Sequence, residues 1–154
     1  MLVDILPAGP YNSSHRDQSE SEGEMVRCEL VKIMITETAD PQVIVLKETE
    51  GERGFPILIG ISEAIAIDRK IRGYEPARPL THDLLASVIA DLGGTVDRVE
   101  VCGIQENTFY ARLIISQNGQ TLEVDSRPSD AIALAVRLEA PILVAEEVLD
   151  EVCP

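Results

Sequence analysis

The chain has 154 residues, of which 45% are hydrophobic and 26% charged, a composition typical of one globular domain. It contains no apolar run of the roughly 20 residues that a membrane-spanning helix needs, which excludes a helical membrane protein. Its first residues lack the basic region and apolar segment of a secretory signal, so we expect a cytoplasmic protein. The three cysteines are widely spaced, which argues against a disulfide framework and a structural zinc site, and we expect reduced thiols.

The net charge of −14 is concentrated at the two ends of the chain. Residues 1–24 hold five acids and one base, and residues 139–154 hold five acids and no base. An acidic surface repels polyanions, because binding of nucleic acid depends on Lys and Arg beside the phosphates. The composition therefore argues against non-specific coating of DNA, although a few local bases suffice to hold one phosphate group.

The first predicted elements follow an acidic segment, residues 1–24, that has no apolar periodicity and is expected to be disordered. Apolar and polar residues then alternate, as in a strand that buries one face. Further strands are predicted at 43–46 and 55–59, joined by a polar turn as in a hairpin. A helix follows up to Gly73, with Ser62 as its expected N-cap.

The second half of the chain continues with a connection at 73–80 that holds two prolines. Thr81 is the expected N-cap of a helix that runs through Leu92. Three strands and a helix are predicted next, at 95–104, 108–116, 120–125 and 129–138. The dipeptide Asn118-Gly119 between the last two of these strands is a strong signal for a hairpin turn.

The chain is expected to end with a short strand at 141–145 and a frayed turn at 146–152. These elements divide the sequence into an N-terminal arm of residues 1–24, a domain of residues 25–150 and a tail of residues 151–154.

The domain shows an internal repeat, because residues 61–67 match residues 128–134 at an offset of 67. The same offset aligns Gly51-Glu52 with the Asn118-Gly119 turn. Each matching segment follows a hairpin and a strand, which predicts two duplicated β-β-β-α units. Neither three-stranded unit can bury its apolar face alone, so we expect an α+β domain whose two units share one sheet system with helices packed on it.

Polar side chains that could perform chemistry are concentrated in two segments, of which the first is residues 78–83. His82 and Asp83 lie in the first turn of the predicted second helix. His82 is the only histidine outside residues 1–24, so a histidine general base would have to be His82. The alternative is that this histidine is an ordinary surface or capping residue.

The second segment is residues 125–130, where a strand ends and a helix starts. Free backbone N–H groups and the helix dipole favour an anion there, and Arg127 adds a planar donor fork that suits phosphate. Asp125 and Asp130 could together hold a hard cation such as Mg²⁺. In the alternative interpretation Ser129 caps the helix, Asp130 complements the helix dipole and Arg127 pairs with a neighbouring acid.

Three segments together resemble the bifunctional nuclease domain family over about residues 25–150. They are MVRCEL at 25–30, RPLTHDLL at 78–85 and DSRPSDAIALA at 125–135. The resemblance implies a duplicated α+β fold, an oligomeric assembly, and the nuclease activity on both DNA and RNA that is ascribed to some members.

We therefore predict hydrolysis of phosphodiester bonds in DNA and RNA by in-line attack of water. The reaction needs a base, a cation beside the phosphate and, as the expected cofactor, a divalent ion such as Mg²⁺ at Asp125 and Asp130. The predicted catalytic residues are His82, Asp83, Asp125, Arg127 and Asp130, and the predicted substrate-binding residues are Arg78, Arg127 and Ser129.

The competing hypothesis is a non-catalytic oligomeric module that binds an anion or a partner protein. The low content of basic residues favours this module, whereas the family resemblance favours the nuclease. In both cases we expect a homo-oligomer, most simply a two-fold dimer, because each unit offers more apolar strand surface than its own helix covers. Nucleic acid is the expected substrate, and no membrane partner is predicted.

Overall fold

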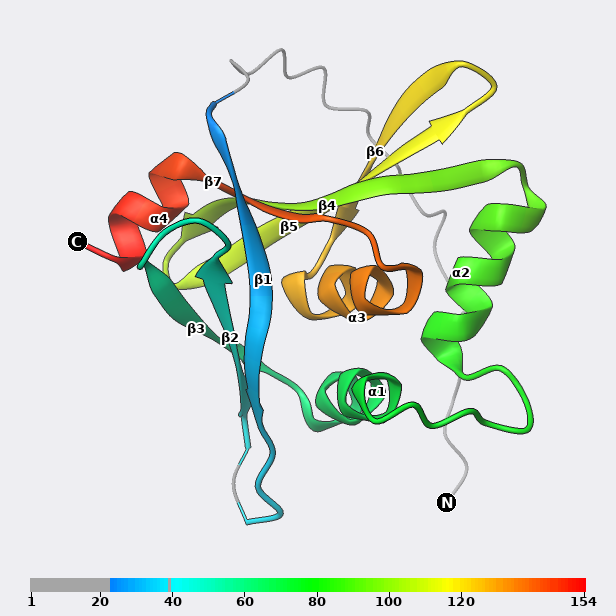
Figure 1. The fold of residues 1–154 in the computed structure, drawn as a ribbon, viewed down its shortest axis with the longest axis horizontal. Coiled ribbons are helices and arrows are strands. Elements are labelled where there is room, and N and C mark those ends of the chain that lie inside the picture. The colour runs from blue at the N-terminus through cyan, green and yellow to red at the C-terminus, as the bar shows by residue number, and fades with distance from the viewer. Residues whose placement is uncertain (1–22, 39) are drawn as a thin grey trace, which may run out of the picture.

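The computed structural model describes residues 23–38 and 40–154 of the chain (Figure 1). The strands are β1 (Met25–Met34), β2 (Gln42–Glu48), β3 (Gly54–Ile59), β4 (Gly94–Gln105), β5 (Thr108–Gln117), β6 (Gln120–Ser126) and β7 (Ile142–Ala145). The helices are α1 (Ile61–Ile71), α2 (Thr81–Asp91), α3 (Pro128–Leu138) and α4 (Glu146–Val152). The predicted N-terminal arm lies outside the described residues except for its last two positions.

All the described strands form one seven-stranded sheet in the order β3-β2-β1-β7-β4-β5-β6. Within it, β1, β2 and β3 form one antiparallel meander, and β4, β5 and β6 form another. The short β7 joins the two meanders, since it pairs antiparallel with β1 and parallel with β4. The expected α+β fold with one shared sheet is therefore confirmed, and the duplication of its units stays a prediction.

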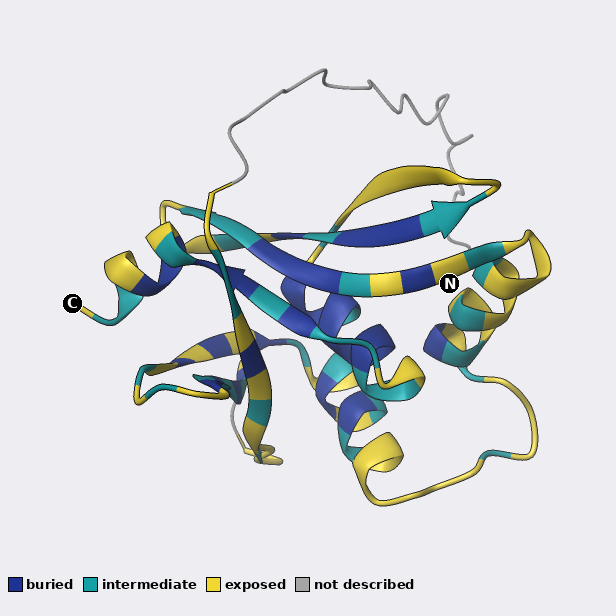
Figure 2. Cartoon of the chain, turned by 45° about the horizontal axis from the view of Figure 1, so that its top comes forward, coloured by how far each residue is buried: buried dark blue, intermediate teal, exposed yellow. Residues whose placement is uncertain are grey.

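Helices α1, α2 and α3 lie on the same side of the sheet, with α3 between the other two helices and the strands β4 and β5 (Figure 1). Seven of the eleven residues of α3 are buried, which makes it the central helix of the domain (Figure 2). Its apolar side chains pack against the buried faces of the strands in one core. None of the described helices is long and apolar enough to cross a membrane.

The helix starts correct one set of predictions, because Ser62, Thr81 and Ser129 are not N-caps. The helices begin with Ile61, Thr81 and Pro128, and the residues before them make no side-chain cap hydrogen bond. Proline at the first position of α3 has no N–H group to satisfy, which favours a start at that residue. At α2 the Asp83 carboxylate accepts a hydrogen bond of 2.9 Å from the backbone N–H of Leu80.

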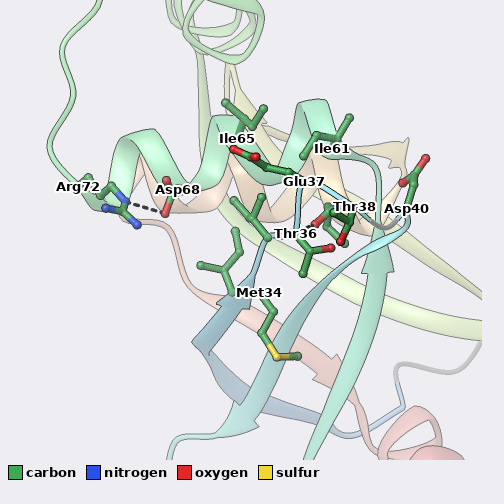
Figure 3. A pocket seen from close by; sticks show the side chains of 12 residues that line it. Met34, Thr36, Glu37, Thr38, Asp40, Ile61, Ile65, Asp68 and Arg72 are labelled. Atoms are coloured by element: carbon green, nitrogen blue, oxygen red, sulfur yellow. Dashed lines mark hydrogen bonds and ion pairs between the residues drawn. The ribbon is translucent and has the colours of Figure 1, made fainter.

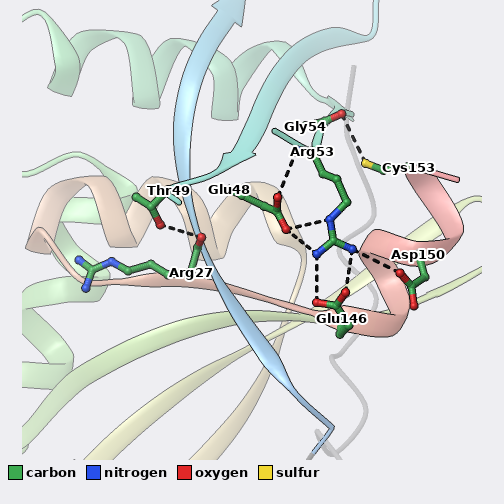
Figure 4. Close-up of polar contacts among 8 residues, drawn as sticks. All are labelled: Arg27, Glu48, Thr49, Arg53, Gly54, Glu146, Asp150 and Cys153. Carbon is green, nitrogen blue, oxygen red and sulfur yellow. Dashed lines mark hydrogen bonds and ion pairs between the residues drawn. The ribbon is translucent and has the colours of Figure 1, made fainter. Parts of the chain in front are cut away.

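The predicted frayed turn at 146–152 is wrong, because these residues form helix α4. Val148 and Leu149 are buried in the core, which anchors the helix. Arg53, the last residue before β3, donates hydrogen bonds to Glu146 at 2.7 Å and to Asp150 at 3.3 Å (Figure 4). The predicted tail at 151–154 therefore begins inside α4.

The guanidinium of Arg53 also holds Glu48, whose pKa is lowered by the hydrogen bond that it accepts from Arg53 at 2.8 Å (Figure 4).

The three cysteines are free, as predicted. Burial raises the pKa of Cys28 to about 11, since desolvation disfavours its thiolate. This thiol is therefore a poor nucleophile at neutral pH.

Candidate active site

The starts of α1, α2 and α3 and the end of β6 border a cleft of about 760 Å³, which we call the helix-start cleft. The cleft exists because α3 packs against both other helices, so that their first turns meet. Residues with ionisable side chains, from four elements, belong to its lining. They are Glu63, Arg69, His82, Asp125, Arg127 and Asp130.

A hydrogen bond between His82 and Asp130 lies at the centre of this group. The Nε2 atom of His82 is 2.9 Å from Oδ1 of Asp130. An ionised carboxylate can only accept, so Nε2 carries the proton and Nδ1 is the acceptor of the neutral ring. His82 is only 9% exposed, and this burial together with the hydrogen bond fixes the orientation of the ring.

Arg127 links Asp130 to a second acid, Glu63 of α1. Its Nε atom donates to Asp130 at 2.9 Å and its Nη2 atom donates to Glu63 at 2.8 Å. Hydrogen bonds to Glu63 and then to Asp130 raise the pKa of Arg127. The arginine side chain is still 65% exposed, so a ligand in the cleft can reach the guanidinium.

Glu63 is a site residue that was missed in the sequence. The internal repeat contained a signal for it, since the offset of 67 aligns Glu63 with Asp130. Gly60 makes its position possible, because a Cβ at residue 60 would lie 2.5 Å from Oε2 of Glu63. The absence of a side chain at Gly60 leaves room for the carboxylate that binds Arg127.

Asp83 faces away from this network and binds Arg137 of α3. The Asp83 carboxylate accepts hydrogen bonds from the Arg137 guanidinium and from the backbone N–H of Leu80. The bond with Arg137 is the largest cause of the lowered pKa of Asp83. Asp83 does not line the helix-start cleft as the structure describes it. Its contacts hold the first turn of α2 against α3.

Asp125 lies at the edge of the cleft, where β6 ends. In the register of β5 and β6, Asp125 lies opposite Arg112 and Val124 lies opposite Leu113. Residues opposite each other project from the same face of a sheet, and Leu113 belongs to the core beneath the helices. The Asp125 side chain therefore shares the other face with Arg112, outside the hydrogen-bonded network of His82.

The two remaining predicted site residues lie outside the cleft lining. Arg78 is exposed in the connection before α2. Ser129 is 7% exposed and packs into the domain at the start of α3. The structure thus brings His82, Arg127 and Asp130 together, and it leaves Arg78 and Ser129 outside the cleft lining.

A divalent cation was predicted at Asp125 and Asp130. Among the described residues, no group of three or more His, Cys, Asp or Glu side chains is arranged to hold a metal ion. The Asp130 carboxylate contacts His82 and Arg127, and the Asp125 side chain projects from the other face of the sheet. The cation at these two residues stays a prediction.

A second and larger cleft, of about 1190 Å³, lies on the other side of α1, next to the end of β1. Its polar lining includes Asp68 and Arg72, which are joined by a hydrogen bond of 2.9 Å (Figure 3). No residue from the two predicted polar segments lines it. The helix-start cleft is therefore the better candidate for chemistry, although it is the smaller one.

Comparisons with known proteins agree with the resemblance seen in the sequence. Residues 44–153 match the family model described as the bifunctional nuclease domain. An uncharacterized protein of Mycobacterium tuberculosis (strain H37Rv) is 45% identical over 120 residues, which cover 78% of this chain and 71% of that protein.

Two plant relatives carry names that state an activity. Bifunctional nuclease 2 of Oryza sativa subsp. japonica is 31% identical over 114 residues, which are 71% of this chain and 35% of that protein. Bifunctional nuclease 1 of Arabidopsis thaliana is 30% identical over 105 residues, which are 66% of this chain and 32% of that protein. The matched segment of the family model contains the whole helix-start cleft. This chain belongs to the bifunctional nuclease domain family.

Proposed function

We propose that this chain is a nuclease that hydrolyses phosphodiester bonds at the helix-start cleft. One observation carries the proposal: a buried histidine is held at 2.9 Å by Asp130, beside an exposed arginine in an open cleft. General bases in hydrolases need this kind of orienting partner, and phosphate needs a nearby cation. The names of the plant relatives support the same activity.

His82 would act as the general base. Because Nε2 donates to Asp130, Nδ1 is the ring atom that accepts the proton of the attacking water. The new P–O bond forms as the bond to the leaving oxygen breaks. The leaving oxygen, on the opposite side of the phosphorus, takes a proton from solvent, and the imidazolium releases its own proton to solvent afterwards. Asp130 stabilises the imidazolium while the proton resides on the ring.

Arg127 would bind the scissile phosphate. The Nη1 atom of its guanidinium has no hydrogen bond to the described residues, whereas Nε and Nη2 are held by the two acids. The acids fix the plane of the donor fork, and the charge of the guanidinium neutralises the phosphate in the transition state. Arg78 and Ser129 are proposed to assist from beside the cleft, and Asp83 by holding the first turn of α2.

The divalent ion that the sequence predicts has no step in this proposal. Its predicted ligand Asp125 projects from the other face of the sheet, and the Asp130 carboxylate is already held by His82 and Arg127. Activity on both DNA and RNA is proposed from the family. The cytoplasmic location expected from the sequence stays a prediction.

Self-association is proposed from the surface of α2. Leu84, Val88 and Leu92 are 56%, 44% and 69% exposed and lie at successive helical spacings on one stripe. A second copy that covers this stripe would remove apolar surface from water. Light scattering should report a multiple of 16.8 kDa, and a monomeric mass at micromolar concentration would contradict the oligomer.

The competing function is a non-catalytic module that binds an anion or a partner protein. It is favoured by the two carboxylates that already engage Arg127. An assay on highly purified protein separates the two functions, with single- and double-stranded DNA and RNA, each with and without EDTA. Arg127→Ala is the test variant and Arg27→Ala is the matched control, because Arg27 is exposed on β1 and lies outside the cleft lining.

If the chain is a nuclease, the wild type and Arg27→Ala should cleave the strands. The cleavage rate of Arg127→Ala should be lower by about tenfold or more, which is the effect expected from the loss of one charged hydrogen bond. Inhibition by EDTA would support the divalent ion. Absence of cleavage on all four substrates, with or without added Mg²⁺, would leave the binding module as the function.

A further inference from the structure

The basic side chains that lack an acidic partner are distributed unevenly. Most described lysines and arginines form ion pairs. Those without one, within the described part of the chain, are Arg27, Lys32, Arg69, Lys70 and Arg78. Two of them lie on β1, and the other three lie on the last turn of α1 and the connection to α2.

The three residues of this second group lie in the cleft lining or close to its residues in the sequence. Arg69 lines the cleft directly, and its guanidinium lies 5.3 Å from the centre of the Tyr74 ring. Lys70 follows Arg69 in the last turn of α1. Arg78 stands two residues before Leu80, which also lines the cleft. We call Arg69, Lys70 and Arg78 the basic corner, and none of the three forms an ion pair with an acid of the described residues.

Part of the cleft lining is apolar. Ile65, Leu85 and Val124 line the cleft and are 37%, 37% and 41% exposed. No aromatic side chain of the described residues lines it, so bases cannot stack on a ring as they do in many single-strand channels. Flat aliphatic contacts can still cover one or two nucleoside faces.

The size and charge of the cleft limit the substrate. Its volume of about 760 Å³ is within the range of sites for small molecules. Proteins that grip duplex DNA neutralise about 6–10 phosphates, whereas the cations that line this cleft are Arg69 and Arg127. The carboxylates of Glu63 and Asp130 line it as well and already bind Arg127. A long polyanion would therefore gain little affinity beyond the one or two phosphates inside.

We propose that the preferred substrate is a short phosphodiester of dinucleotide size that carries a second, terminal phosphate. The scissile phosphate binds Arg127, the terminal phosphate binds the basic corner, and a nucleoside packs against Ile65, Leu85 and Val124. This inference rests on the proposed function, since it names the substrate of the same cleft.

The test compares a 5′-phosphorylated dinucleotide, the same dinucleotide without the terminal phosphate, a long single strand and a long duplex. Hydrolysis is followed as kcat/KM per phosphodiester bond, and binding of a non-hydrolysable phosphorothioate dinucleotide is followed by calorimetry. The variant Arg69→Ala/Lys70→Ala removes part of the basic corner. The matched control is Arg27→Ala/Lys32→Ala, which removes two exposed, unpaired cations from β1 and lowers the net charge equally.

In the wild type and in the control, we expect KM and the dissociation constant to be about tenfold higher for the dinucleotide without the terminal phosphate. In the Arg69→Ala/Lys70→Ala protein, both constants should be nearly the same for the two dinucleotides. Binding should weaken with salt with a logarithmic slope of about −1 to −2, against about −5 or steeper for a protein that grips a duplex.

Equal kcat/KM on the duplex and the dinucleotide, or a steep salt dependence of binding, would contradict the proposed substrate class without contradicting the proposed nuclease activity. Absence of hydrolysis on every substrate, with tight binding that still depends on the terminal phosphate and the basic corner, would overturn the nuclease and retain the ligand. Equal dissociation constants with and without the terminal phosphate would overturn the proposal.

Discussion

Glu63 and Asp130 occupy the same position in two matching helix starts, 67 residues apart, and both carboxylates bind the guanidinium of Arg127. The arginine itself has no counterpart in the first unit, where Gly60 stands in its place. The start of α3 thus supplies the cation, Arg127. At the start of α1, Gly60 leaves space for the carboxylate of Glu63, and α2 adds His82.

Replacing Arg127 should separate function from stability. Arg127→Ala removes two exposed ion pairs, which are worth about 0–1 kcal/mol, so the melting temperature should fall by only a few degrees. Phosphodiester cleavage should fall about tenfold or more, because one charged contact to the phosphate is lost. Thermal unfolding and kcat/KM, measured on the same preparation, check this. A parallel loss of stability and activity would mean that Arg127 is structural.

Gly60→Ala should disturb the site through Glu63 alone. The backbone at residue 60 has φ −71° and ψ 158°, which alanine adopts without strain, so stability should change by less than about 0.5 kcal/mol. The added Cβ would lie 2.5 Å from Oε2 of Glu63, and the carboxylate must move away from its place beside Arg127. We expect kcat to fall while the melting temperature is retained.

Gly103→Ala is the matched control for this change, because a Cβ at residue 103 meets nothing within 4 Å. Equal kcat values for the two alanine variants would show that the contact between Glu63 and Arg127 does not contribute to the reaction.

Asp83→Ala should destabilise the domain. The Arg137 side chain is 7% exposed, and loss of its partner would leave a buried charge uncompensated, at a cost of about 3 kcal/mol. Asp83→Ala/Arg137→Met removes the charge as well and should recover much of this loss. Denaturant unfolding of the two variants checks the prediction, and equal stabilities would contradict it.

The pH dependence of the same pair has a defined sign. The pKa of Asp83 is lowered in the folded state, chiefly by Arg137, so its contribution to stability is fully present above the ordinary aspartate value of about 3.9. That contribution is lost as the pH falls below this value towards the folded pKa. The difference in unfolding free energy between wild type and Asp83→Ala should therefore shrink in acid, and a constant difference from neutral pH down to acid would refute the assignment.

The strands and helices could be predicted from the sequence because their signals are local. Alternation in the strands, helical spacing of apolar residues and the Asn118-Gly119 turn depend only on neighbouring positions, and both turn residues have positive φ. The place of β7 between β1 and β4 could not be predicted, since pairing of a four-residue strand depends on contacts far apart in the chain.

The residues of the candidate site could likewise be predicted only in part. His82, Arg127 and Asp130 were found because residue type and helix position restrict their chemistry. The partners that orient them depend on how helices pack, so neither Glu63 nor Arg137 was recognised. The sequence segment 125–130 predicted that Asp125 lies beside Asp130. The side of the sheet from which the Asp125 side chain projects depends on its register opposite Arg112.

The measurement that tests the central claim most directly is a double-mutant cycle on His82 and Asp130, read as single-turnover phosphodiester cleavage. If His82 is the base and Asp130 its orienting partner, His82→Ala should lower the rate by about 100-fold or more, and adding Asp130→Ala should cause little further loss, because the two side chains act as a unit. Wild-type rates in His82→Ala, or losses that simply multiply in the double variant, would contradict the account.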